Sequence, residues 1–180
     1  MRDNPINIAA FGVNPMRRQE ALARFFRVAM QGTYKRGSLL GAFKDAALIG
    51  ICGMTPPGKC QPSVLEKLWM LPVLLVGNSP KVPLRVSRWV GEWSRRDPDE
   101  PHWHLGPVAV DAHHRSRGIG GALVAAFCAR VDATATSAYL ETDKKENVPF
   151  YERYGFSVQA EGTVLGVPNW FMKRSPRKGK

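Results

Sequence analysis

Apolar and polar positions alternate with two different periods along the first third of the chain. Residues 6–11 form a short apolar run, which predicts a first strand. Asn14-Pro15 supplies a helix start signal, and apolar residues follow it at helical spacing: Leu22, Phe25, Phe26 and Ala29. The chain is therefore expected to open with a strand and then a helix.

Further apolar runs bounded by polar or glycine-rich turns predict strands at 39–43, 47–52, 102–111, 137–142, 156–160 and 167–172. Lys44-Asp45 lies between the first two and predicts a hairpin, and the last two predict a closing hairpin. The run 102–111 is expected to be the central strand, with His102, His104 and Gly106 on one face. Helical spacing recurs at 123–131 and at 147–154.

Residues 55–101, called the insert below, break this pattern with many prolines. Two short helical patterns lie within the insert, at 64–71 and 82–93. The insert is too long for one simple loop, so two short helices are expected to cover one end of the sheet. Their large side chains either shape a substrate pocket or only pack the helices onto the sheet: Trp69, Met70, Trp89 and Trp93.

The segment from Arg115 to Gly121 reads Arg-Ser-Arg-Gly-Ile-Gly-Gly and lies between the central strand and the helix at 123–131. The first N–H groups of a helix lack partners and carry the positive end of its dipole, so such a turn binds anions. Glycine allows close approach of a phosphate, and arginine adds forked donors. A P-loop is excluded because no Gly-Lys-Ser/Thr ending follows. A Rossmann fingerprint is excluded because Leu123 stands in place of its third glycine.

The pattern Arg115-x-x-Gly118-x-Gly120 resembles the acetyl-CoA pyrophosphate loop of the GNAT superfamily of N-acetyltransferases. A second block follows in the expected order. Tyr139-Leu140-Glu141-Thr142 and then Asn147-Val148-Pro149-Phe150-Tyr151-Glu152-Arg153-Tyr154-Gly155-Phe156 look like that superfamily's strand and following helix. With Trp170-x-Met172, these residues most resemble the branch that contains puromycin N-acetyltransferase. The resemblance covers about residues 102–173.

The resemblance implies an α+β fold, with a central, mostly antiparallel twisted sheet that contains a splayed pair of parallel strands and is flanked by helices. It implies acetyl-CoA as cosubstrate and no metal. Pro107 departs from the family pattern and is expected to set a bulge in the central strand. The cofactor-binding residues carried over from the family are Val108, Ala109, Val110, Arg115, Ser116, Arg117, Gly118, Ile119, Gly120, Gly121, Asn147, Phe150 and Tyr151.

In this superfamily a neutral amine attacks the thioester directly. The resemblance assigns protonation of the departing thiolate to Tyr151, with Tyr154 as the substitute. The N–H of Val108 would polarise the thioester carbonyl. The group that accepts the amine proton stays open between Glu141 and the two strand histidines, His104 and His102. Asn147 is expected to cap its helix and orient the cofactor arm.

The predicted activity is therefore acetyl transfer to the primary amine of a small molecule. A peptide or protein N-terminus is the alternative acceptor. A different class of function, a catalytically inactive module that binds acyl-CoA or nucleic acid, is the further alternative. An amine would be attracted by acidic residues near the expected site: Asp97, Asp99, Glu100 and Glu141.

Composition adds limits to this picture. A chain of 180 residues fits one domain, expected at 1–173 and followed by a basic C-terminal tail at 174–180. The run of basic residues itself starts one position earlier, at Lys173. The formal net charge of +11 suits a polyanion such as coenzyme A, and nucleic acid is not expected as a partner. A homodimer is left open.

Cysteine usage and hydropathy bear on compartment and on metal binding. Three cysteines, Cys52, Cys60 and Cys128, form no C-x-x-C motif and are odd in number, which indicates a reducing compartment, with Cys128 in the core. No signal peptide or membrane anchor is indicated, so a cytoplasmic protein is expected. A metal site from His102 and His104 with His113-His114 is not expected, because a strand and the loop after it rarely converge on one ion.

Overall fold

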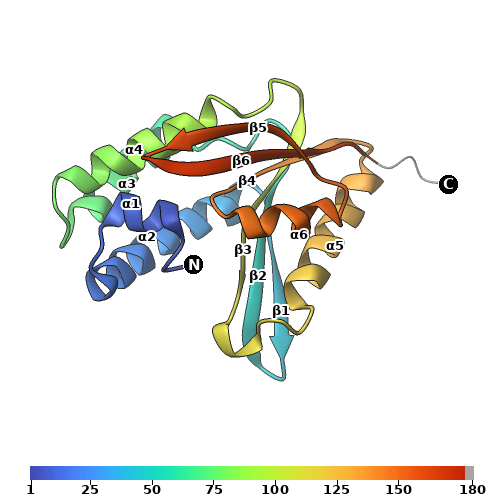
Figure 1. The fold of residues 1–180 in the computed structure, drawn as a ribbon, viewed down its shortest axis with the longest axis horizontal. Coiled ribbons are helices and arrows are strands. Elements are labelled where there is room, and N and C mark those ends of the chain that lie inside the picture. The colour runs from blue at the N-terminus through green and yellow to red at the C-terminus, as the bar shows by residue number, and fades with distance from the viewer. Residues whose placement is uncertain (177–180) are drawn as a thin grey trace.

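A six-stranded sheet in the order β1-β2-β3-β4-β6-β5 organises the computed structural model, which describes residues 1–176 (Figure 1). Only β3 and β4 run parallel to each other, and the other neighbouring pairs are antiparallel. The strands are β1 Ser38–Lys44, β2 Ala47–Thr55, β3 His102–Val110, β4 Ser137–Thr142, β5 Ser157–Val164 and β6 Val167–Arg174. The predicted α+β fold with a mostly antiparallel sheet is confirmed.

Helices cover the sheet on both faces. They are α1 Pro5–Phe11, α2 Pro15–Arg36, α3 Val64–Leu75, α4 Lys81–Ser94, α5 Ile119–Ala133 and α6 Val148–Glu152, with short 3₁₀ turns at Ala112–His114 and Lys145–Asn147. In Figure 1, α1 to α4 gather at one end, whereas α5 and α6 lie beside the other part of the sheet. Within residues 1–176, no helix combines the length and apolar character needed to cross a bilayer.

The two faces of the sheet have separate cores. On one face, α1, α2 and α4 pack Phe25 and Trp89 against Tyr139 and Phe171. On the other face, Val124, Phe127 and Val131 of α5 pack against Leu105, Leu140 and Met172, and Cys128 is buried beside them as expected. The sheet is therefore held between two apolar layers, and burial of these side chains supplies the main driving force for the fold.

β3 and β4 are paired over only a short distance. Their register runs from His102 opposite Ser137 to His104 opposite Tyr139 and stops there. Residues 105–110 of β3 continue along β2 without a strand partner on their other side. The predicted splay between the two parallel strands is therefore confirmed, and it leaves one edge of the central strand open.

A bulge bends the central strand at the point where the splay begins. Cys52 faces Val108 and Met54 faces Leu105, so the single residue Gly53 lies opposite Gly106-Pro107. A Cβ atom on Gly53 would lie 2.4 Å from the carbonyl oxygen of Gly106, so no other residue fits there without a backbone shift. The bulge predicted from Pro107 is confirmed.

The prediction of a strand at residues 6–11 is wrong, because this segment forms α1. Pro5 occupies the first turn, and the buried Asp143 carboxylate accepts the N–H of Ile6 at 2.8 Å. Ile6 and Ala10 are buried one helical turn apart. A short apolar run is compatible with both the strand period and the helical period. The Asp143 carboxylate, which is distant in the sequence but lies at the N-terminus of α1, favours the helix.

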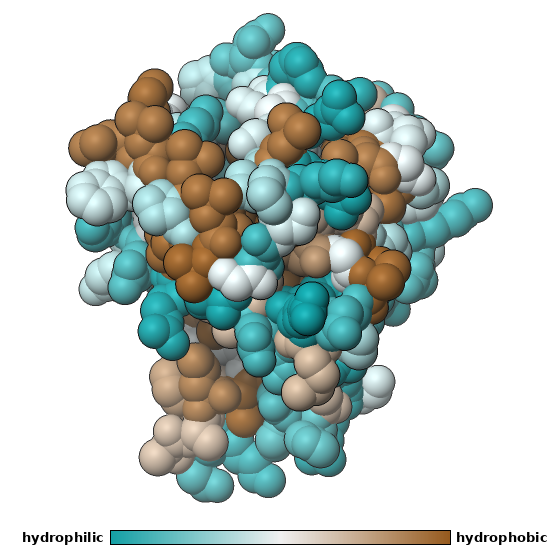
Figure 2. Space-filling model, turned by 90° about the vertical axis from the view of Figure 1, so that its left-hand side faces the viewer, coloured by the Kyte–Doolittle hydropathy of each residue, from teal (hydrophilic) through white to brown (hydrophobic). Residues whose placement is uncertain are grey.

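The predicted helix starts and the insert helices agree with the structure. The Asn14 side chain accepts the N–H groups of Met16 and Arg17 at the start of α2. Ser63 and Glu66 form a capping box at the start of α3. Apolar residues gather on the surface at the end of the molecule where α1 to α4 lie, which faces the viewer in Figure 2. α3 exposes several large apolar side chains: Val64, Leu65, Leu68, Trp69 and Leu75.

The C-terminal boundary differs from the sequence interpretation. β6 extends through Lys173 and Arg174, which were expected to belong to a basic tail. Arg174 is only 2% exposed, and its guanidinium donates two hydrogen bonds of 2.7 Å to the Asp132 carboxylate and one of 2.8 Å to the Tyr154 carbonyl. Residues 177–180 of the expected tail lie outside the described residues.

This ion pair gives a test of the corrected boundary. Asp132→Ala leaves the Arg174 guanidinium buried without its carboxylate, so the free energy of unfolding should fall by about 3 kcal/mol. Glu20→Ala, on the exposed surface of α2, should change it by less than about 0.5 kcal/mol. Urea unfolding followed by circular dichroism measures both. Equal stability of the two variants would contradict a structural role for Arg174.

Candidate functional site

The turn before α5 presents free backbone donors. Gly118 caps the helix with φ +79°, in the left-handed region that glycine tolerates best, and Ser116 before it has φ 58°. The N–H groups of Ile119, Gly120 and Gly121 lie in the first helical turn, where no intrahelical carbonyl can reach them. The predicted anion-binding turn therefore has the required backbone, and Arg115 beside it adds charge.

The two glycines in this first turn have different surroundings. A Cβ on Gly120 would lie 3.7 Å from Val110 and 3.9 Å from Phe150, at ordinary contact distances. A Cβ on Gly121 would lie 2.4 Å from the hydroxyl oxygen of Tyr154. A side chain at Gly121 would therefore displace the Tyr154 hydroxyl, whereas Gly120 lines the groove described below, into which a longer side chain would extend.

The open edge of β3 presents alternate residues to the gap. The Asp111 N–H donates to the Ile49 carbonyl at 2.9 Å, so hydrogen-bonded pairs alternate from there along the antiparallel β2–β3 ladder. That alternation directs the backbone groups of Ala109 toward β2. The N–H and C=O groups of Val108 and Val110 are directed toward the gap instead. Of the predicted strand residues, only Val108 and Val110 can therefore offer backbone groups to a ligand.

Aromatic residues of α6 and the following turn close the other side of this gap. The Tyr151 ring packs 5.0 Å from Phe150 and 6.0 Å from Phe156, measured between ring centroids. Burial raises the pKa of the Tyr151 phenol to about 12, with a smaller contribution from Cys52. Tyr151 is therefore a protonated hydrogen-bond donor throughout the neutral and mildly alkaline range.

Asn147 does not cap α6 as predicted. Its side chain makes no capping bond, and its Nδ2 donates instead to the Thr142 hydroxyl at 3.1 Å. Pro149 lies in the first turn of α6, where its missing N–H removes one of the donors that a cap would satisfy. Asn147 therefore links the start of α6 to the end of β4 through this hydrogen bond.

One groove brings most of the predicted cofactor residues together: Val108, Val110, Arg115, Ser116, Gly118, Ile119, Gly120, Gly121, Asn147, Phe150 and Tyr151. Ala109 and Arg117 are not among its lining residues. His114 and Arg153 also line it, and of these two only Arg153 had no role expected from the sequence. Arg153 lies within the quoted motif, and its guanidinium carbon is 5.6 Å from the Phe150 ring centroid. The groove therefore combines basic side chains, free backbone groups and a phenol.

His104 lies between two carboxylates on the strand pair. Its Nε2 is 3.1 Å from Glu141 Oε2, and its Nδ1 is 3.7 Å from Asp97 Oδ1. Burial alone would lower the pKa of His104, but Glu141 and Asp97 outweigh it and raise the pKa well above its ordinary value. A histidine that already carries its proton cannot accept one from an amine, so the geometry disfavours His104 as the base.

His102 is held in a similar way. Its Nε2 lies 3.0 Å from Asp97 Oδ1, and its Nδ1 lies 2.9 Å from the Glu100 carbonyl oxygen. Burial lowers the pKa of His102, but the bond to Asp97 and the neighbouring Cys60 outweigh it and raise the pKa to about 10. Glu141, with a side chain only 4% exposed, is the remaining predicted base at this point of the sheet.

Cys60 joins these residues, which the sequence did not indicate. One ligand atom each of Cys60, Asp97, His102 and His104 lies within 4.8 Å of the others. Burial alone would raise the pKa of the Cys60 thiol, but the two histidines outweigh it and lower the pKa to about 7. Cys60 precedes His102 by 42 positions, so only the fold reveals their proximity. His113 and His114, the other two histidines, are not part of this cluster, and His114 Nδ1 lies 3.2 Å from Asp111 Oδ1.

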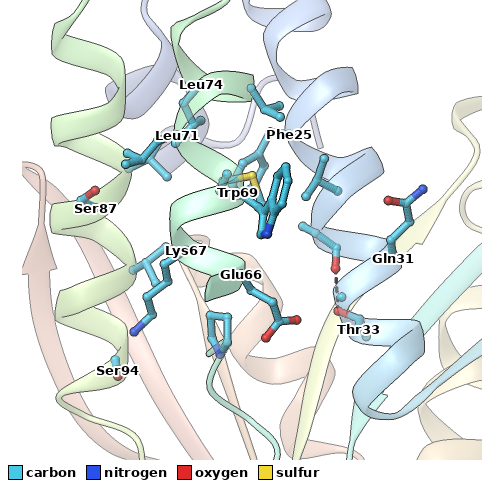
Figure 3. A pocket seen from close by; sticks show the side chains of 18 of the residues that line it. Phe25, Gln31, Thr33, Glu66, Lys67, Trp69, Leu71, Leu74, Ser87 and Ser94 are labelled. Carbon is cyan, nitrogen blue, oxygen red and sulfur yellow. Dashed lines mark hydrogen bonds between the residues drawn. The ribbon is translucent and has the colours of Figure 1, made fainter. Parts of the chain in front are cut away.

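The large residues of the insert have two different roles. Trp89 is buried against Phe25, and the Trp93 Nε1 donates to Asn169 at 3.1 Å, so both pack the insert onto the body of the protein. Trp69 and Met70 line a mostly apolar cavity between α2, α3 and α4, together with the ion pair of Arg36 and Glu66. Figure 3 shows Trp69 and Glu66 of α3 facing Thr33 of α2 across this cavity.

Comparison with known proteins agrees with this architecture. Residues 85–158 match the family model for an acetyltransferase (GNAT) domain. Similar solved structures include histone acetyltransferase HPA2 and related acetyltransferase from Corynebacterium glutamicum, at 20% identity and TM-score 0.70, over 98% of this chain and 86% of that one. Naa20 from Chaetomium thermophilum, in complex with a bisubstrate analogue, matches at 16% identity and TM-score 0.53, over 98% and 84%. At these identities the likeness establishes the fold.

Thiol reactivity tests the environment of Cys60. Burial, with Cys128 as a smaller influence, raises the pKa of Cys52 to about 12, and Cys128 is itself buried. In buffer with EDTA at pH 7.5, iodoacetamide should therefore alkylate Cys60 at least about tenfold faster than the other two thiols, because the thiolate is the nucleophile. Peptide mass mapping over time measures the rates. Faster labelling of Cys52 or Cys128 would contradict the described environments.

Proposed function

We propose that the chain is a GNAT-type N-acetyltransferase, which transfers the acetyl group of acetyl-CoA to the primary amine of a small molecule. The observation that carries the proposal is the convergence of three features on one groove. These are the N-terminus of α5, the open edge of β3 and the Tyr151 phenol. Each feature suits a different part of acetyl-CoA, in the order in which the cofactor would lie along the groove.

The pyrophosphate would bind at the turn before α5. The N–H groups of the first helical turn point at the anion, and the helix dipole favours negative charge there. Arg115 and Arg153 lie on the same groove and supply charge, and His114 beside them can donate a further hydrogen bond. Gly120 leaves room for the phosphates beside Val110 and Phe150.

The pantetheine arm would extend β3 as an added strand. Its amides can pair with the outward backbone groups of Val108 and Val110, which have no strand partner in the gap. The N–H of Val108 would also donate to the thioester carbonyl oxygen. A fixed donor at that position stabilises the negative charge that develops on the oxygen during attack.

The reaction then needs two proton transfers. The amine nitrogen attacks the thioester carbon, the C–S bond breaks, and the thiolate leaves. Tyr151 donates its phenol proton to that thiolate, and the proton lost by the amine passes through Glu141 or water to restore the phenol. Glu141 is the candidate for this role because it lies on β4 beyond the last residue that pairs with β3, beside the gap.

A small acceptor is supported by the insert. α3 and α4 with α2 form a mostly apolar cavity, which suits an amine with an apolar body. Pro62 and Arg95 line the cavity and lie two residues from Cys60 and Asp97, which contact the strand histidines. A peptide N-terminus is the alternative acceptor.

The substrate class is tested with purified protein and acetyl-CoA. Release of coenzyme A thiol, followed with a thiol-reactive dye, is compared across a panel of hydrophobic primary amines and a panel of peptides with free N-termini. Turnover on amines that exceeds turnover on peptides supports the proposal. Turnover on peptides alone would replace it with the peptide alternative. Binding of acetyl-CoA without turnover on either panel would indicate an inactive acyl-CoA-binding module.

Substitution at Gly120 tests the cofactor groove. Gly120→Glu places a carboxylate where the phosphates would bind, so acetyl-CoA should no longer stabilise the protein. Gly120→Ala adds only a methyl group at ordinary contact distances and should retain binding. At 100 times its Kd, acetyl-CoA should raise the wild-type and alanine midpoints by about 5–10 °C. Thermal denaturation measures the shift. An equal shift in the glutamate variant would place the cofactor elsewhere.

Substitution at Tyr151 tests the proton donor. Tyr151→Phe should lower kcat by about 100-fold and leave the KM for acetyl-CoA within about twofold, because only the transferred proton is lost. Tyr34→Phe, an exposed residue of α2, is the control and should leave both constants unchanged. Because burial raises the pKa of Tyr151 to about 12, its deprotonation should not reduce the wild-type rate below about pH 11. Unchanged kcat in Tyr151→Phe would exclude the role.

A further inference from the structure

We propose that the cluster where the insert meets the central strand is a zinc site. Its four ligands would be Cys60, Asp97, His102 and His104. The inference stands apart from the proposed acetyl transfer, because it depends only on donor types, distances and hydrogen bonds at this cluster. Cysteine sulfur, two imidazole nitrogens and one carboxylate oxygen form a mixed donor set that Zn²⁺ binds in tetrahedral geometry.

The distances approach those of a tetrahedral site. All four ligand atoms lie within 4.8 Å of one another. Asp97 Oδ1 is already 3.0 Å from His102 Nε2 and 3.7 Å from His104 Nδ1. Ligand atoms around tetrahedral zinc lie about 3.3–3.7 Å apart, so the ligand atoms would need to shift relative to one another by about 1.5 Å at most.

The second nitrogen of each histidine has a partner that orients the ring for metal binding. His102 Nδ1 lies 2.9 Å from the Glu100 carbonyl oxygen and must donate to it, so Nε2, on the side of Asp97, is the nitrogen that can bind an ion once zinc displaces its proton. His104 Nε2 donates to the Glu141 carboxylate at 3.1 Å, so Nδ1 is the nitrogen that can bind the ion, again with loss of a proton. His104 Nδ1 is also a buried atom without a hydrogen-bond partner. Histidine ligands of zinc are commonly held in this way.

The carboxylate is oriented by a similar bond. Gln61 Nε2 donates to Asp97 Oδ2 at 2.7 Å, so Asp97 Oδ1 is left for the interior of the cluster. Cys60 precedes Gln61 directly and is partly exposed, so an ion can reach its thiol from solvent. The cluster therefore has four donors and a polar group behind each of three of them, which is the arrangement of a complete metal site.

The position of the cluster suggests what the ion does. Cys60 lies between β2 and α3, and Asp97 follows α4, so they mark the two ends of the insert. Both histidines lie on β3, before the strands separate. Four protein ligands leave no open coordination position, as is typical of a structural zinc site. The ion would link both ends of the insert to the central strand through shared coordination. It would also hold the His104 ring in one orientation, in contact with Glu141.

The test uses the full chain, dialysed against a chelator and then titrated with zinc in competition with a chromogenic chelator. Wild type and His113→Ala, which removes an exposed histidine outside the cluster, should each bind one equivalent. Cys60→Ser and Asp97→Asn should bind zinc at least about tenfold more weakly, since even the loss of a residue that only orients a metal ligand has that effect. Zinc should raise the thermal midpoint of wild type and slow alkylation of Cys60.

Cobalt gives a second readout that does not depend on variant folding. Co²⁺ added to the wild type should produce a thiolate-to-cobalt charge-transfer band that zinc then removes. Absence of the band and of bound zinc would overturn the proposal and leave a metal-free hydrogen-bond network. Equal zinc affinity of Cys60→Ser and wild type would also overturn it. Neither result depends on acetyl-CoA binding or amine turnover, so failure of the acetyltransferase proposal would be seen separately.

Discussion

The short pairing between β3 and β4 is the constraint on which the rest of the structure depends. The strands are joined only from His102 to His104, and beyond that point the central strand bonds to β2 alone. Backbone groups left without partners are costly unless water or a ligand meets them. The separation is therefore maintained by the surrounding structure: the bulge at Gly106-Pro107 bends β3, and Gly53 is the residue that fits against it.

The paired end of these strands and the separated end serve different purposes. At the paired end, imidazoles and carboxylates satisfy one another in a largely buried cluster around His104. At the separated end, backbone donors, glycines and arginines border an open groove. Charge is neutralised within the protein at the first end, whereas the basic side chains of the second border open space. Glu141 lies on β4 beyond the last residue that pairs with β3, and its carboxylate contacts His104 at the paired end.

Much of the fold and of the groove could be predicted because the signals are local. The glycine turn, the strand before it and the helix after it are contiguous, and Tyr151 lies in a compact motif. The errors arose where distant residues decide the outcome. Asp143 stabilises the start of α1 from 137 positions away, and Asp132 draws Arg174 into β6 from 42 positions away. Cys60 carries no motif of its own, so its place beside His102 and His104 follows only from the folded chain.

The insert leaves the sheet after β2 and returns to it at β3, and its two ends meet at the same cluster. Between these two points α3 and α4 pack against α2, on the far side of the sheet from α5. The cavity that we propose for the acceptor and the groove that we propose for the cofactor are therefore built from separate segments of the chain, which share only the central strand and its neighbours.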